Sequence, residues 1–417
     1  MGSSLLAGCS GDTGGGGGGG DSEGDWTLKV QHWWTSGAAR KAMDFLINGY
    51  KERNPKATVN DNPVAGSAGT NLQAVIREKV LSGDPPSTWQ DWPGLNLKPY
   101  TEANALKDIT AIWEDETDMA ANFREGPKLA ARAGNPDNPF VCVPTNIHRI
   151  NNIFYDIQTI EQAGVDPDGI SDPNELVEVV KKAQADTGMA GISWQTGSAW
   201  STLQVFSVNF LGLHGADAYR KFRTGEDLDT EISEALQVTK DLMQYNIKDA
   251  SSVSNDEAAA KITNGNAVFV QEGDWQGANY QVTEGYKYGE DWGHAPWPGT
   301  DGDYLINTDG FPYPTPNPSP PATDAWMKWV GSAEAQAGFN PIKGGVPCRT
   351  DVDVSDFPPF LQDQFDDFKN AQSNPLTITH GDGVTPNQGV ALKDAMSRFI
   401  SSKDVSATTS AVLTALS

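Results

Sequence analysis

The order of predicted elements in the first hundred residues constrains the fold most. Residues 26–34 alternate apolar and polar side chains, as a strand with one buried face does. A helix that Ser36 can cap follows and stops before Pro55. A second helix starts near Thr70, and a Gly-Asp-Pro-Pro turn then leads into a short segment, Trp89 to Trp92. Strands that alternate with helices predict an α/β domain with a mainly parallel sheet.

The remaining chain is long enough for a second domain. At 417 residues it exceeds one ordinary hydrophobic core, so two domains are expected. An apolar strand is predicted at 140–144 and another at 267–270. Helices are expected at 175–185, 201–211, 231–245, 256–263 and 322–339.

The acidic composition excludes one class of partner. The formal net charge is −25, and such a surface repels the phosphates of a nucleic acid. The acidic residues are spread along the whole chain rather than collected in a tail. We expect them to keep the surface hydrated at high salt, which points to a halophilic source; the alternative is an ordinary acidic protein.

The N-terminus has the pattern of a lipid-anchored exported protein. Residues 6–9 read Leu-Ala-Gly-Cys, which is typical of a lipobox with Cys9 as the lipidated residue. The Gly run and acidic segment up to residue 25 would form a flexible tether. The apolar stretch before Cys9 is short for a secretion signal and has no basic flank, so the recorded start is expected to be truncated. The other cysteines, Cys142 and Cys348, would form either one disulfide or two buried thiols.

Aromatic and polar residues occur together where predicted strands end. The ligand-binding residues that we predict are Trp33, Trp34, Gln90, Trp92, His148, Trp275, Asp309, Lys343 and His380. Aromatic rings cover the apolar faces of a sugar, and charged or amide groups bind its hydroxyls. Ligands of open α/β sheets bind beyond the carboxyl ends of the strands, which places several of these segments in one cleft between two lobes. Because neighbours in a strand face opposite ways, one of Trp33 and Trp34 is expected to face the ligand.

Five segments in this order resemble the extracellular solute-binding proteins of carbohydrate ABC importers, in particular the glucose/mannose-binding branch. They are HWWTSG at 32–37, VPTNIHRINNIFYD at 143–156, QEGDWQG at 271–277, PWPGTDGDYLINTDGF at 296–311 and FNPIKGGVPCRTDV at 339–352. With the lipobox and the charge, they suggest a haloarchaeal lipoprotein. The resemblance covers nearly everything from Trp26 onward.

The resemblance implies a two-lobed, type II periplasmic-binding-protein fold. Its hinge has several segments, and the cleft between the lobes holds the ligand. The first lobe would hold 26–143 and 299–343, and the second 148–298 and 346–417. The resemblance also implies a role for each site residue. The tryptophans would stack on the sugar, and Gln90, Asp309 and Lys343 would bind its hydroxyls, the last two on adjacent positions. Asp274 would support the turn before Trp275.

Two positions depart from the family pattern and leave the sugar open. Trp92 stands where that branch usually has a histidine, and Ala38-Ala39 stand where an acid is usual. His148 is as well suited to a structural contact in the hinge as to ligand binding. No histidine spacing typical of zinc is present, so no metal is expected.

The leading hypothesis is a monomeric sugar-binding protein, not an enzyme, that works without a cofactor. It would capture a monosaccharide, glucose or a related aldohexose, on the extracellular face of the membrane and deliver it to ABC permease subunits served by a cytoplasmic ATPase. Alternatives are binding of a pentose, disaccharide or polyol, or a surface lectin. A glycoside hydrolase would need two carboxylates about 5–10 Å apart, for which Asp91, Asp274 and Asp309 are the candidates.

Overall fold

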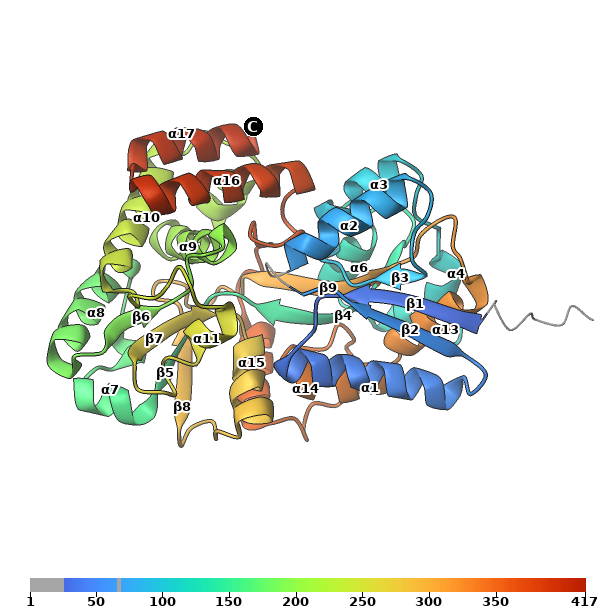
Figure 1. Ribbon diagram of the computed structural model, residues 1–417, viewed down its shortest axis with the longest axis horizontal. Coiled ribbons are helices and arrows are strands. Elements are labelled where there is room, and N and C mark those ends of the chain that lie inside the picture. The colour runs from blue at the N-terminus through green and yellow to red at the C-terminus, as the bar shows by residue number, and fades with distance from the viewer. Residues whose placement is uncertain (1–25, 66–68) are drawn as a thin grey trace, which may run out of the picture.

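Two α/β lobes lie side by side and are joined by strands that run between them (Figure 1). The computed structural model describes residues 26–65 and 69–417. The predicted lipidation site at Cys9 and the tether up to residue 25 lie outside the described residues. The mixed α/β, two-lobed architecture confirms the fold class expected from the sequence.

A parallel sheet of order β2-β1-β3 forms the centre of the first lobe. Its strands are β1 (Thr27–His32), β2 (Thr58–Pro63) and β3 (Thr88–Trp89). Its helices are α1 (Gly37–Arg53), α2 (Thr70–Leu81), α3 (Lys98–Glu102), α4 (Thr110–Trp113), α5 (Met119–Asn122), α6 (Glu125–Ala131), α13 (Pro320–Val330) and α14 (Ala333–Lys343). Leu28 and Val30 of β1 are fully buried, as the alternation predicts.

Two antiparallel strands run from this lobe toward the second one, in the middle of Figure 1. They are β4 (Cys142–Arg149) and β9 (Ile306–Pro312). The sequence predicts only the start of β4, because its later residues are polar side chains that are buried by partners far along the chain. Helix α15 (Pro359–Asn370) also bridges the lobes: Phe360 packs in the second lobe, and Phe365 and Phe368 contact the first.

The second lobe has a mixed sheet of order β6-β7-β5-β8. Its strands are β5 (Asn152–Asp156), β6 (Ala190–Ser193), β7 (Ala267–Glu272) and β8 (Trp292–Pro296). Strand β5 runs antiparallel to both neighbours, so the expectation of a mainly parallel sheet holds for the first lobe alone. The helices are α7 (Ile157–Ala163), α8 (Pro173–Thr187), α9 (Ala199–Arg223), α10 (Asp229–Leu242), α11 (Asn255–Ala259), α12 (Trp275–Ala278), α16 (Pro386–Ser402) and α17 (Val405–Leu416).

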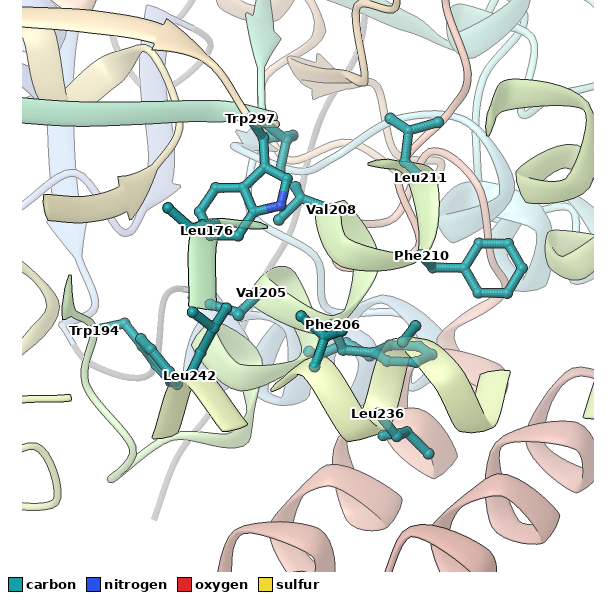
Figure 2. Close-up of a cluster of buried hydrophobic side chains, with 14 of the residues drawn as sticks. Leu176, Trp194, Val205, Phe206, Val208, Phe210, Leu211, Leu236, Leu242 and Trp297 are labelled. Carbon is teal, nitrogen blue, oxygen red and sulfur yellow. The ribbon is translucent and has the colours of Figure 1, made fainter. Parts of the chain in front are cut away.

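Helix α9 forms the centre of the second lobe. Every residue from Trp200 to Leu211 is buried, as expected for a helix that is covered on all sides. Figure 2 shows part of this cluster, in which Val205 and Phe206 lie among side chains that include Leu242 of α10. Such packing holds the first turn of α9, and therefore Trp200, in a defined position.

Some element boundaries differ from those expected. The single helix predicted at 322–339 is two helices, α13 and α14, because the chain breaks at Gly331 and the Ser332 hydroxyl caps α14 by accepting from the Ala335 amide at 3.1 Å. Ser36 precedes α1 as predicted, but its side chain does not cap the helix.

Packing also refines where the chain passes between lobes. Val346 and Cys348 belong to the first lobe's hydrophobic cluster, whereas the sequence assigns everything from 346 to the second lobe. Main-chain hydrogen bonds of 2.8 Å in both directions between Ile147 and Val346 hold this segment beside β4. Cys348 and Cys142 are free, buried thiols rather than a disulfide, and burial raises the pKa of each.

Candidate functional site

A cavity of about 290 Å³ lies between the two lobes. The first lobe contributes Trp33, Trp34 and Trp92 to its lining, and the second contributes Trp200, Asn255, Asp256, Trp275 and Asn279. His148, Asn307, Asp309, Lys343 and His380 line it from the segments close to the hinge. Both lobes therefore contact anything bound in it.

Aromatic rings form a wall that continues from one lobe to the other. The ring centroids of Trp33 and Trp92 are 4.9 Å apart, and those of Trp200 and Trp275 are 6.3 Å apart. The His380 ring joins these pairs, at 4.6 Å from Trp92 and 5.4 Å from Trp200. Burial lowers the pKa of His380 well below its usual range, so its imidazole is neutral at neutral pH. The wall offers flat, uncharged surfaces for the apolar face of a ligand.

Buried charges lie beside this wall. The Lys343 Nζ is 3.5 Å from Asp309 Oδ2 and 2.6 Å from His148 Nε2, and His148 Nδ1 is 2.5 Å from Asp274 Oδ1. His148 Nδ1 donates to the Asp274 carboxylate, and Nε2 also lies 3.3 Å from Asp309 Oδ2. Burial and Lys343 lower the pKa of His148, but the two carboxylates outweigh them, so this pKa lies above its ordinary value. All four side chains are at most 5% exposed.

The protonation of Asp309 and Lys343 follows from their surroundings. Burial raises the pKa of Asp309, but Lys343 and His148 outweigh it, so the pKa lies well below its ordinary value. Burial lowers the pKa of Lys343, and the carboxylates of Asp309 and Asp274 partly oppose this. Asp309 is therefore an ionised acceptor beside an amine donor, a pair suited to bind two adjacent hydroxyls by charge-assisted hydrogen bonds.

Residues behind the lining hold these groups in place. Gln90 Nε2 donates to Asp309 Oδ1 at 3.1 Å, while its Oε1 accepts from the Trp33 amide at 3.2 Å. Asn146 Nδ2 donates to the other Asp309 oxygen at 3.3 Å. Asp274 Oδ2 accepts from the Arg149 amide at 3.0 Å, which orients the carboxylate that binds His148.

Hydrogen bonds join the two lobes next to the cavity. The Ala38 amide donates to Asn279 Oδ1 at 3.1 Å, and Lys41 Nζ donates to the Val282 carbonyl at 2.7 Å. The Ser36 hydroxyl lies 3.4 Å from Asp256 Oδ2. These contacts join the start of α1 to the second lobe, so the structure represents a closed arrangement.

The structure thus has two lobes with a cavity lined with aromatic and charged residues between them. A family model described as bacterial extracellular solute-binding protein matches residues 33–337. The chain belongs to this family. No helix in the described part of this solute-binding protein is sufficiently long and apolar to cross a membrane.

Individual relatives agree with the family assignment. The chain is 32% identical over 397 residues to a protein of Haloferax volcanii named as xylose/arabinose-binding, an alignment that covers 94% of this chain and 85% of that one. It is 31% identical to an uncharacterised ABC transporter extracellular-binding protein of Pyrococcus horikoshii, over 93% of this chain and 87% of the other. The solved structure of the bacterial solute receptor AcbH has a TM-score of 0.78 at 18% identity, covering 93% of this chain and 97% of that chain, which shows a shared fold.

The cavity brings together all the residues predicted for ligand binding except Gln90. Gln90 is fully buried behind the lining, and both ends of its amide are used inside the protein. Trp33 and Trp34 both line the cavity, because β1 ends at His32 and the strand alternation stops before them. That one of them faces the ligand stays a prediction. Of the three carboxylates considered for a hydrolase, Asp309 lines the cavity and Asp91 and Asp274 do not.

Several lining residues were not predicted. Asn307 could have been predicted from the sequence, because it lies two residues before Asp309 in β9 and therefore on the same face of the strand. Asn255 and Asp256 begin α11, and Asn279 follows α12. Nothing in their local pattern separates these from surface residues at helix ends. Trp200 lies in the first turn of the buried helix α9, and its local pattern is that of a core residue.

A second cavity of about 470 Å³ adjoins the first. It lies between α2 and α3 of the first lobe and the start of α16 of the second. Trp92 and His380 line both cavities, so their rings form part of the boundary between them.

Proposed function

We propose that this solute-binding protein captures a monosaccharide in the interlobe cavity and delivers it to the permease subunits of an ABC importer. The observation that carries the proposal is the buried Asp309–Lys343 pair inside a cavity walled by tryptophan. Ionised donors and acceptors beside aromatic faces suit a ring that has hydroxyls around its edge and C–H groups on its faces. The names of the relatives support sugar as the solute.

The size of the cavity favours a single sugar ring. Its volume of about 290 Å³ is at the lower end of the range for small-molecule pockets, which starts near 300 Å³. A disaccharide would have to pass Trp92 and His380 to use the adjoining cavity. We propose glucose or a related aldohexose as the ligand. A pentose is the second candidate, favoured by the name of the Haloferax volcanii relative.

Closure of the two lobes would couple binding to delivery. A ligand that contacts Trp33 and Trp34 of one lobe and Trp275 of the other favours the closed state by the difference in its affinity for the two states. Anchoring through Cys9 at the extracellular face would keep the receptor near its permease. We expect it to act as a monomer.

The test is a thermal-shift and calorimetric screen of the full chain in high salt against glucose, mannose, galactose, xylose, arabinose, maltose and trehalose. A ligand that binds only the folded state raises the melting temperature. We expect a rise with one or more monosaccharides and none with the disaccharides. A cooperatively melting protein that responds to no sugar would contradict the proposed function, and a response to xylose and arabinose alone would favour the pentose alternative.

A further inference from the structure

Two buried polar atoms at the cavity have no partner in the described part of the chain. They are Oδ1 of Asn307 and the indole Nε1 of Trp200. The side chains are 1% and 3% exposed, and both line the cavity. A buried donor or acceptor without a partner is unfavourable, and most such groups in native proteins are paired.

We propose that Asn307 Oδ1 and the Trp200 indole N–H bind hydroxyl groups of the sugar directly. This inference rests on the proposed function and adds two contacts to it. The Asn307 oxygen only accepts, so it takes a hydroxyl hydrogen, whereas the indole N–H only donates and takes a hydroxyl oxygen. Asn307 and Asp309 would supply two acceptors, and Trp200 and Lys343 two donors, at separate points around one sugar ring.

The position of Asn307 supports a ligand contact. It lies opposite His148 in the β4–β9 register and two residues from Asp309 in the same strand. The pleat of β9 thus directs Asn307 and Asp309 to the same face, on which Lys343 and His148 already contact Asp309. A hydroxyl bound by Asn307 is therefore expected to lie next to the hydroxyls bound by the charged pair.

Trp200 would provide a contact from the other lobe. Ser198 caps α9 by accepting from the Trp200 amide, and the buried turns that follow hold the indole at the cavity. Its ring contacts His380 and Trp275, so the indole is part of the aromatic wall. A sugar that binds Asn307 and Trp200 at once would link β9 to the second lobe and favour closure.

The absence of a partner is not sufficient by itself. Trp292 Nε1 is also buried without a partner within residues 26–65 and 69–417, but Trp292 packs in a hydrophobic cluster of the second lobe and does not line the cavity. The combination of an unpaired atom and a cavity lining distinguishes Asn307 and Trp200. Trp292 therefore provides a matched control.

The experiment measures the affinity of the full chain for glucose and xylose by calorimetry. Asn307→Leu removes the acceptor and Trp200→Phe removes the N–H while retaining an aromatic ring. We expect each to weaken binding of the preferred sugar by about 3- to 10-fold, the effect of one lost hydrogen bond, and Trp292→Phe to bind like the wild type. Asn307→Ala replaces Asn307→Leu if leucine lowers the melting temperature without sugar.

Monodeoxy analogues of the preferred sugar identify the hydroxyl involved. The analogue that lacks this hydroxyl should bind the wild type about as weakly as the parent sugar binds the Asn307 variant. The Asn307 variant should bind this analogue and the parent sugar with equal affinity. Variants that fold and bind within twofold of the wild type would overturn the inference and leave the proposed function intact. A wild-type chain that binds no sugar would overturn both.

Discussion

At the scale of single residues, the site shows how charges are kept inside the protein. Asp309 accepts from Gln90 and Asn146 and faces Lys343 and His148, so its oxygens are paired on several sides. Removing one partner of such a group leaves a buried charge without compensation, which is strongly unfavourable. Because Asp309 and Lys343 also line the cavity, any hydrogen bonds that the pair can still make are available to a ligand there.

Trp275→Ala is expected to abolish most sugar binding. Trp275 is half-buried in the cavity wall, and the aromatic surface it buries against a ligand contributes on the order of 1–3 kcal/mol. Calorimetry against the preferred sugar measures the loss, and the melting temperature without sugar shows whether the fold is retained. Unchanged affinity in a folded variant would remove Trp275 from the site.

Glu272 makes the stability of the protein depend on pH. Burial raises its pKa to about 8, although Asn255 and the Gly273 amide partly stabilise the carboxylate. The native state therefore keeps a proton that the unfolded state loses near its ordinary pKa of about 4.5. Because the native state binds more protons across this interval, stability falls as pH rises from about 4.5 to about 8.

Glu272→Gln tests this linkage. Glutamine resembles the protonated acid but does not titrate, so the variant should be more stable than the wild type near pH 8 and close to it near pH 4.5. The difference in the free energy of unfolding, measured in urea at several pH values, should grow with pH by a few kcal/mol at most. A difference that does not change with pH would show that Glu272 ionises at its ordinary pKa.

At the scale of elements, the turn between β7 and α12 sets the position of Trp275. A Cβ added to Gly273 would lie 2.2 Å from the Trp275 ring. That ring is a half-buried side chain that can move, so the substitution should displace the ring rather than unfold the lobe. Glycine thus permits the ring to fold back against its own turn.

Gly273→Ala is therefore expected to weaken sugar binding by about tenfold with little change in stability, since a small misplacement of an aromatic contact forfeits part of its burial. Gly126→Ala is the control. Its new methyl group would meet only Ile306, at 3.8 Å, and it replaces a helical glycine of α6, so stability should be equal or slightly higher. Equal affinity in Gly273→Ala and Gly126→Ala would contradict the role of the turn.

At the scale of the whole molecule, the net charge affects the stability of the folded state. The net charge is −25, so the acidic side chains repel one another in the compact folded state, and salt screens this repulsion. The melting temperature should therefore rise between 0.1 M and 2 M KCl, measured by scanning calorimetry without sugar. Because potassium chloride raises ionic strength without strongly salting out apolar groups, a melting temperature that falls or stays constant would contradict a destabilising net charge.

Much of the architecture could be predicted from local sequence. The period-2 pattern of β1 and the spacing of Leu72, Ile76 and Val80 in α2 report burial on one face of an element, and both elements occur where expected. Tryptophans at strand ends predicted the cavity residues Trp33 and Trp275, because in α/β sheets strand ends are where ligands bind. Such signals lie within a few residues along the chain. The role of Asp309 was implied by the family resemblance, and Asp309 lies within β9 rather than at its end.

Contacts between distant segments decided the rest. Gln90 lies behind the cavity because Trp33 and Asp309 use both ends of its amide, and Trp200 reaches the cavity because the second lobe packs around α9. The mixed strand order of the second sheet and the boundary formed by Trp92 and His380 also depend on segments far apart in sequence. The sequence by itself determined which elements form and which residue types reach their ends. Only the tertiary structure decided which of those side chains face the ligand and which support it, because that depends on where the two lobes meet.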